Sequence, residues 1–190
     1  MSDVIHNWSF TSTPTKGQWA HIVHLANTLM IYCPTLASDG SKLRDAVMTY
    51  VDDADGKTDR AVFVDHLSPR LVQTNEWGEE YIVFNGLEPS AGDPFVMPCS
   101  DECQTVNTYG RAYDDLVLAL LILIKDSFAD LITVSTGATL DDLGRGLRAA
   151  READSRVRIH PDLIADSMTR VRFDPAEMVI RRPETLDFTA

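Results

Sequence analysis

The segment YDDLVLALLILIKDSF, from Tyr113 to Phe128, decides how the rest of the chain can fold. It contains nine consecutive apolar residues, Leu116 to Ile124, with two aspartates before them and a lysine after them. Crossing a bilayer takes about 20 apolar residues, so this run is too short to span a membrane. Aspartate favours the first turn of a helix and lysine the last, and a helix that is apolar on every side is a buried one. We therefore expect a central core helix, with a dimer interface as the alternative.

Two helices are expected to precede it. Residues 16–32 carry apolar side chains at helical spacing and stop just before Pro34. Residues 41–53 repeat that spacing after Ser41, a suitable N-cap. Residues 1–15 are predicted to form an N-terminal arm.

The middle of the chain changes to the pattern of β-strands. Three short runs rich in β-branched and aromatic residues, at 60–67, 70–75 and 80–86, predict an antiparallel meander. The next segment, 87–110, contains three prolines and two glycines without a sustained period. We expect it to form a long irregular loop.

A strand and a helix are predicted after the central helix. Residues 131–135 favour the strand, and residues 139–154 favour a helix in which Thr139 and Asp142 are spaced much like a capping box. In that helix Gly146, like Gly144, either weakens the helix or marks a close approach to its neighbour.

Short strand-like runs at 157–159, 169–173 and 178–181 follow. The whole pattern predicts one compact α+β domain over residues 1–190. It would contain two N-terminal helices, an antiparallel meander, a central buried helix and a C-terminal strand-helix-strand segment.

The charge balance argues against several classes of partner. The chain has 29 Asp and Glu against 17 Lys and Arg, a net charge of -12. Nucleic acids and anionic membranes attract cations, so we expect neither as a partner. Mimicry of nucleic-acid charge is an alternative, but the acids occur in pairs without a long run, and solubility explains them better. Three cysteines and an N-terminus without a signal-peptide pattern predict a cytoplasmic protein.

The nearest approach to a metal site combines Cys99 and Cys103 with His21 and His24. Zinc prefers thiolates and imidazoles in groups of four. The segment CSDEC has one residue more than the common short zinc knuckle, and nothing in the sequence brings the two pairs together. Buried thiols and ordinary histidines are the favoured interpretation.

Two loops resemble ligand sites only in part. DDADGKTD, residues 52–59, is acidic around Gly56, but the calcium-loop template would place valines at its first and last ligand positions. VSTGATLDD, residues 134–142, has a strand-turn-helix pattern that binds phosphate elsewhere, yet its two aspartates would repel an anion. Nucleophile and dinucleotide motifs are absent from the sequence. No catalytic residue, metal ligand or cofactor is therefore assigned.

Aromatic and acidic residues outside the expected core are candidates for a protein interface. Trp77 lies at a predicted hairpin turn, next to Glu79 and Glu80, and Trp8 and Phe10 lie in the predicted N-terminal arm. Exposed aromatic residues often anchor protein partners. Folding back onto the core is the other outcome for such large side chains.

The strand EYIVFNG, followed by CQTVNTYGRAYDDLVLALLILIKDSFADLITVSTGATLDDLGRGLRAARE, resembles a group of small uncharacterised proteins of bacteria and bacteriophages. That group has a strand ending in F-N-G, a cysteine-containing loop, an aromatic-Asp pair opening an apolar helix, and then a strand, a turn and a helix. The resemblance covers Tyr81 to Glu152, and STGATLDD replaces the group's acidic, tryptophan-bearing turn. It implies a shared fold and a phage or mobile-element origin, and it transfers no catalytic residue.

The sequence therefore favours a non-enzymatic, acidic interaction protein that binds a host or viral protein or associates with itself as a homo-oligomer. The alternative is a small enzyme or zinc protein that uses Cys99 and Cys103 with His21 and His24.

Overall fold

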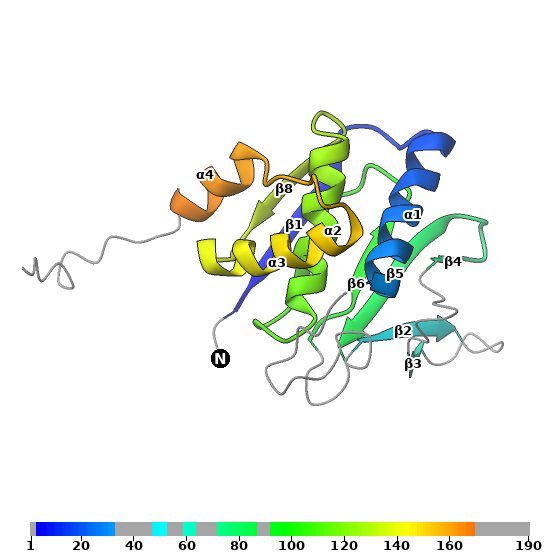
Figure 1. Cartoon of the computed structure of the whole chain (residues 1–190). Coiled ribbons are helices and arrows are strands. Elements are labelled where there is room, and N and C mark those ends of the chain that lie inside the picture. Colours follow the sequence, from blue (N-terminus) through cyan, green and yellow to red (C-terminus); the bar gives the residue numbers. More distant parts are fainter. Residues whose placement is uncertain (1–2, 33–46, 53–58, 64–71, 87–91, 170–190) are drawn as a thin grey trace, which may run out of the picture.

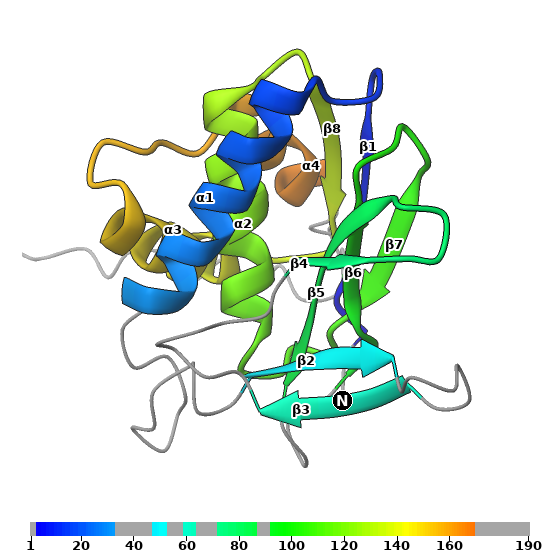
Figure 2. The same ribbon diagram turned by 90° about the vertical axis from the view of Figure 1, so that its right-hand side faces the viewer.

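The computed structural model describes residues 3–32, 47–52, 59–63, 72–86 and 92–169 (Figure 1). In chain order the elements are β1 (Ile5–Phe10), α1 (Lys16–Tyr32), β2 (Val47–Asp52), β3 (Asp59–Phe63), β4 (Val72–Thr74), β5 (Glu80–Gly86), β6 (Phe95–Pro98), β7 (Gln104–Asn107), α2 (Asp114–Ser127), β8 (Ile132–Thr136), α3 (Leu140–Ala153) and α4 (Pro161–Thr169). Helices α1, α2 and α3 lie on one side of the strands (Figure 2). This is the α+β class predicted from the sequence.

The strands form two antiparallel sheets. One has the order β7-β1-β8, so the first strand of the chain lies in its middle. The other has the order β3-β2-β5-β4. Strand β6 also pairs with β5, on the edge opposite β4. Segments that are far apart in sequence, 5–10, 104–107 and 132–136, therefore meet in the first sheet.

Helix α2 is the centre of the core, as the sequence predicts. Every residue from Asp114 to Lys125 is buried. Strand β8 packs against α2, and so do α1 and α3. Among the helices that the structure describes, none is long and apolar enough to cross a membrane.

Helix α3 packs closely on α2 because of a glycine. A Cβ atom at Gly146 would lie 2.6 Å from the Cβ of Leu118, whereas one at Gly144 would meet only the Arg148 guanidinium, at 3.9 Å. Gly146 is thus the close approach that the sequence left as one of two alternatives. The predicted capping box is also present: the Thr139 side chain accepts from the Asp142 N–H, and the Asp142 carboxylate accepts from the Thr139 N–H.

The prediction of an N-terminal arm over residues 1–15 is wrong for residues 5–10, which form strand β1. Along this strand His6, Trp8 and Phe10 are buried while the residues between them are more exposed. Alternation with a period of two is the mark of a half-buried strand. In the sequence the alternation is visible only over Trp8, Ser9 and Phe10, because the buried position 6 is a histidine and the exposed position 5 is an isoleucine.

The second predicted helix, 41–53, is also wrong where the structure describes it. Residues 47–52 form strand β2, which pairs with both β3 and β5; residues 33–46 and 53 lie outside the described residues. The run is rich in β-branched and aromatic residues, and tertiary pairing decided between helix and strand. The three predicted strands are present as β3, β4 and β5, but β2 separates β3 from β5.

Two further predictions need correction. The segment 87–110 is not an irregular loop, because its described part, 92–110, contains β6 and β7. The run 157–159 is not a strand, and it leads directly into helix α4. Pro161 opens that helix at a position where proline is favoured. The strand-like run 178–181 and most of 169–173 lie outside the described residues.

Candidate binding groove

The hairpin of β4 and β5 ends in a turn that holds a tryptophan in solvent. The Asn75 side-chain oxygen accepts hydrogen bonds from the backbone N–H of Trp77 at 3.1 Å and of Glu79 at 2.9 Å. Gly78 takes a left-handed conformation with φ +82°, which glycine adopts without strain. The turn is therefore fixed by its own hydrogen bonds, and Trp77 remains 77% exposed.

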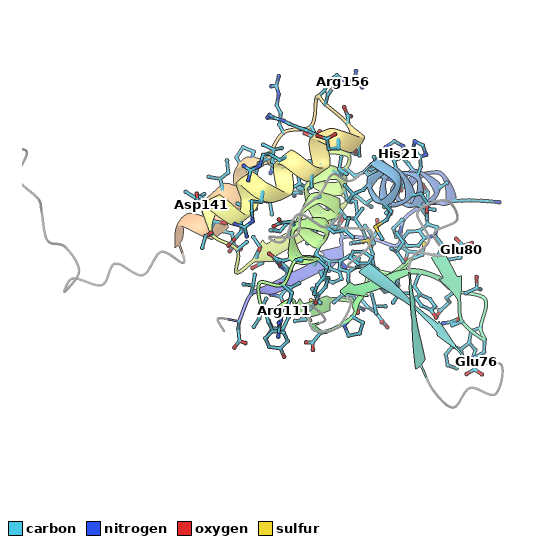
Figure 3. The ribbon with its side chains drawn as sticks, turned by 60° about the horizontal axis from the view of Figure 1, so that its bottom comes forward. His21, Glu76, Glu80, Arg111, Asp141 and Arg156 are labelled. Carbon is cyan, nitrogen blue, oxygen red and sulfur yellow. The ribbon has the colours of Figure 1, made fainter. Side chains whose placement is uncertain are left out.

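Helix α1 is tied to this hairpin just beyond its turn. The indole N–H of Trp19 donates to the Glu80 carboxylate at 2.7 Å, and Trp19 itself is buried. In Figure 3, Glu80 lies next to α1 and Glu76 lies at the far end of the hairpin. A charge-assisted hydrogen bond of this kind is stronger than a neutral one, so it sets the position of the helix against the strand.

A groove of about 610 Å³ lies between α1 and the hairpin. On the helix side it is lined by Lys16, Trp19, Ala20, Val23 and Asn27, and on the hairpin side by Val72 and Glu80. Lys16, Ala20, Val23 and Asn27 follow one another at spacings of four, three and four, which places them on one face of α1, with the buried Trp19 beside them. The groove therefore has an apolar centre and polar ends.

The electrostatic surroundings of the groove are acidic. Glu76, Glu79 and Glu80 of the hairpin are all exposed. Among the described residues that line the groove, Lys16 is the only cation. A ligand that approaches from the hairpin side meets an excess of negative charge.

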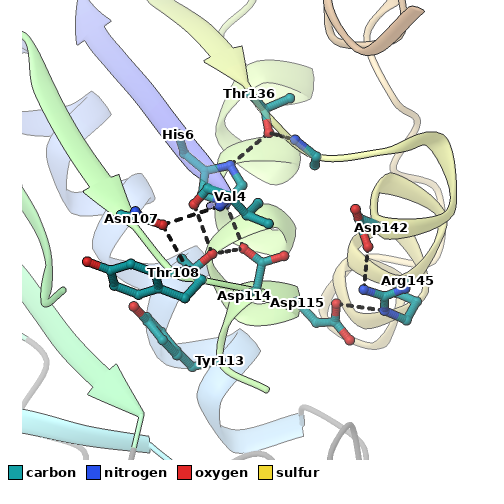
Figure 4. Close-up of polar contacts among 12 residues, drawn as sticks. Val4, His6, Asn107, Thr108, Tyr113, Asp114, Asp115, Thr136, Asp142 and Arg145 are labelled. Atoms are coloured by element: carbon teal, nitrogen blue, oxygen red, sulfur yellow. Dashed lines mark hydrogen bonds and ion pairs between the residues drawn. The ribbon is translucent and has the colours of Figure 1, made fainter. Parts of the chain in front are cut away.

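A second polar cluster lies inside the core (Figure 4). His6 places Nε2 2.6 Å from the Asp114 carboxylate and Nδ1 2.8 Å from the Thr136 hydroxyl. The Thr108 hydroxyl also donates to Asp114. A hydroxyl, an imidazole and a carboxylate in series occur in hydrolases, but here His6, Asp114 and Thr136 are each at most 1% exposed. They are buried in the core, where their hydrogen bonds join β1, β8 and α2.

The neighbouring Asp115 is buried beside a cation. Its carboxylate accepts from the Arg145 guanidinium at 3.1 Å, and Arg145 also bonds Asp142 at 2.5 Å. Burial raises the pKa of Asp115 from 3.8 to about 6, and Arg145 offsets only part of that rise. At Asp142 burial acts in the same direction, but hydrogen bonds from Thr139 and Arg145 outweigh it and lower the pKa. These groups link the first turns of α2 and α3.

The candidate zinc residues are not assembled. His21 packs edge-on against Phe128, with ring centroids 5.4 Å apart, while Cys99 and Cys103 follow β6. Within the described part of the chain no three His, Cys, Asp or Glu side chains are placed to hold a metal. Burial and the nearby Glu80 raise the pKa of Cys99, which keeps it as a thiol. Most of the calcium-like loop, residues 53–58, lies outside the described residues.

The structure separates the candidate interface residues into two groups. Trp8 and Phe10 are 2% and 3% exposed, and Trp8 stacks on Phe95 with ring centroids 4.7 Å apart, so the prediction that they are surface anchors is wrong. Trp77, Glu79 and Glu80 are exposed and lie on the hairpin that forms one wall of the groove.

Sequence reasoning missed the helix side of this groove. Lys16, Ala20, Val23 and Asn27 recur at helical spacing. Val23 belongs to the apolar stripe that predicted the helix and packs against the core, and the other three residues lie beside that stripe. Small and polar residues at the margin of the stripe were the available signal. Only the hairpin beside it turns that margin into a groove.

Comparison with known proteins adds no relative: no family model, no curated protein and no solved structure matches this chain.

Proposed function

We propose that this protein binds another protein, of host or viral origin, through the groove and the hairpin beside it. The observation that carries the proposal is Trp77, which the Asn75 side chain and Gly78 hold in solvent at the tip of that hairpin. Tryptophan is the residue type most enriched among the residues that dominate binding energy at interfaces. A rigid turn favours binding further, because little conformational freedom is lost when the partner docks.

Other exposed apolar residues support the choice of this face. Leu140, Ile164 and Ile5 are 49%, 37% and 36% exposed, against 77% for Trp77. Isolated apolar residues of that moderate exposure are normal on protein surfaces. Trp77 stands apart because it is larger and more exposed, and because it belongs to the hairpin that forms one wall of the groove.

Capture of a partner by matched variants tests the proposal. The tagged full-length protein, Trp77→Ala and Leu140→Ala are each used to capture proteins from a lysate of the cells that make this chain, and captured proteins are quantified by mass spectrometry. Leu140→Ala removes an exposed apolar side chain away from the hairpin, so it controls for general stickiness. We expect one protein at near-equal stoichiometry with the wild type and Leu140→Ala, and its loss with Trp77→Ala.

The same capture at low and moderate salt tests the role of charge. Surface ion pairs weaken as salt screens them. We expect weaker capture at moderate salt, because Glu76, Glu79 and Glu80 surround the contact. Equal capture by all three proteins would show that Trp77 is not the anchor and would overturn the proposal.

A further inference from the structure

Strand β4 has backbone groups on its outer edge that point away from its neighbouring strand β5. In the register of the hairpin, Val72, Gln73 and Thr74 lie opposite Ile82, Tyr81 and Glu80. The Asn75 N–H bonds the Glu79 carbonyl at 3.0 Å, so 75 and 79 form a hydrogen-bonded pair. Such pairs alternate with non-bonded ones along an antiparallel ladder. Positions 74 and 80, and positions 72 and 82, are therefore the non-bonded pairs.

A second contact supports this assignment independently. The Glu80 carbonyl accepts from the Cys99 N–H at 3.0 Å, on the β6 side of β5. The backbone groups of Glu80 thus face away from β4, and those of Thr74 opposite it must face away from β5. Among the described residues none bonds the N–H or C=O groups of Val72 and Thr74.

We propose, resting on the protein-binding function above, that the partner contributes an extended, basic segment that pairs with β4 as an added strand and lies in the groove along α1. Val72 belongs to both features, since its side chain lines the groove and its backbone faces the open edge. An exposed strand edge next to a lined groove is the arrangement that peptide-binding domains use for strand addition.

The length of the groove limits the size of this segment. From Lys16 to Asn27 the helix rises about 17 Å at 1.5 Å per residue. An extended strand covers that distance in about five residues at 3.3 Å each. The proposed ligand is therefore a short stretch of an extended chain, and no folded domain has to enter the groove.

The charge and polarity around the groove define the chemistry of the segment. Ala20, Val23 and Val72 favour aliphatic side chains on the side that faces the groove. Glu76, Glu79 and Glu80 favour Lys or Arg at the positions of the segment that do not face the groove. Alternating aliphatic and basic residues satisfy both requirements, because successive side chains of a strand point to opposite faces.

A synthetic peptide of about seven residues that alternates lysine and valine is the probe, with blocked ends. Titration into the full-length protein is followed by calorimetry and by amide hydrogen exchange. We expect binding together with slowed exchange at the Val72 and Thr74 amides. A peptide that alternates glutamate and valine is the charge control and should not bind.

Two N-methylated forms of the lysine-valine peptide test the backbone pairing directly. One is methylated at every valine nitrogen and the other at every lysine nitrogen. Only one of these two sets of N–H groups can face β4 in an added strand, so one form should lose about tenfold or more in affinity and the other should bind as before. Equal affinity of both forms, or binding without slowed exchange at Val72 and Thr74, would overturn strand addition.

A second copy of this chain is the competing occupant of the edge. Slow exchange of the same amides without peptide, together with a dimer in analytical ultracentrifugation, would assign the edge to self-association and overturn the proposal. The two proposals also fail separately. A partner whose capture needs Trp77 but leaves the β4 amides unprotected removes strand addition and keeps protein binding. Capture that is indifferent to Trp77 removes the binding function itself.

Discussion

His6 and Asp114 form a buried pair at 2.6 Å although 108 residues separate them in the chain. The pair joins β1, in the middle of its sheet, to the first turn of the central helix α2. With the Thr136 hydroxyl on its other nitrogen, His6 has partners at both ring nitrogens. This contact, together with the pairing of β1 with β7 and β8, ties the N-terminal residues into the core.

His6→Ala should therefore destabilise the protein strongly. It leaves the Asp114 carboxylate buried without its imidazole partner, which costs about 3 to 5 kcal/mol. Asp114→Asn, which removes the charge and keeps an acceptor for His6, should cost less. Urea unfolding measures both changes.

His24→Ala is the control for that experiment, because His24 is exposed on α1. Its free energy of unfolding should stay within about 0.5 kcal/mol of the wild type. Equal losses for His6→Ala and His24→Ala would contradict the structural role of the buried pair.

Asp115 should make stability depend on pH in an unusual direction. Its pKa is raised from 3.8 to about 6 in the folded protein, so the folded state holds the proton more tightly than the unfolded chain. The protonated Asp115 carboxyl therefore stabilises the folded state fully below about pH 4. This stabilisation, about 3 kcal/mol in all, is lost as the pH rises to about 6.

Asp115→Asn should remove that dependence. The free energy of unfolding is measured for this variant and for the wild type between about pH 4 and pH 6. The difference between the two proteins should change over that range by nearly the whole of the Asp115 contribution. Asp141→Asn, at an exposed position of α3, should follow the wild-type curve. Parallel curves for Asp115→Asn and the wild type would show that this carboxyl has an ordinary pKa.

The two glycines of α3 should respond in opposite directions to alanine. Gly146→Ala forces a Cβ against Leu118, 2.6 Å away, and overpacking of this kind costs about 1 to 3 kcal/mol. Gly144→Ala meets only the end of the Arg148 side chain and should stabilise the helix by about 0.5 to 1 kcal/mol. Thermal or urea unfolding of the pair checks the prediction, and a loss of similar size at both positions would rule out the close approach as its cause.

Two tryptophans that the sequence grouped together should behave differently. Trp8→Ala removes a buried ring that stacks on Phe95 and should cost about 3 to 5 kcal/mol. Trp77→Ala should leave the free energy of unfolding within about 0.5 kcal/mol, since that side chain is 77% exposed. A large loss of stability in Trp77→Ala would mean that the ring packs on the protein and would remove it as a binding anchor.

Local sequence patterns predicted the elements whose stability depends on their own composition. Helix α1 has the predicted bounds, and the capping residues of α3 hold their predicted roles. The β4–β5 hairpin also lies where turn residues separate two β-rich runs. In each case the deciding interactions join residues close in the chain.

Elements defined by distant partners were missed for a common reason. Strand β2 satisfies helical spacing as well as strand composition, and only β3 and β5 on its two sides select the strand. Strand β1 is short and contains three polar residues, His6, Asn7 and Ser9, beside its aromatic ones. Pairing energy from β7 and β8 cannot be read from either run alone.

The sequence by itself determined that Leu116 to Ile124 would be buried, because nine apolar residues in succession leave a helix no polar face to turn toward water. It also determined the net charge of -12. The tertiary structure alone decided that β1 enters the middle of a sheet, that His6 meets Asp114, and that α1 and the β4–β5 hairpin enclose a groove. Each of these depends on which distant segments come into contact, and local propensity carries no information about that choice.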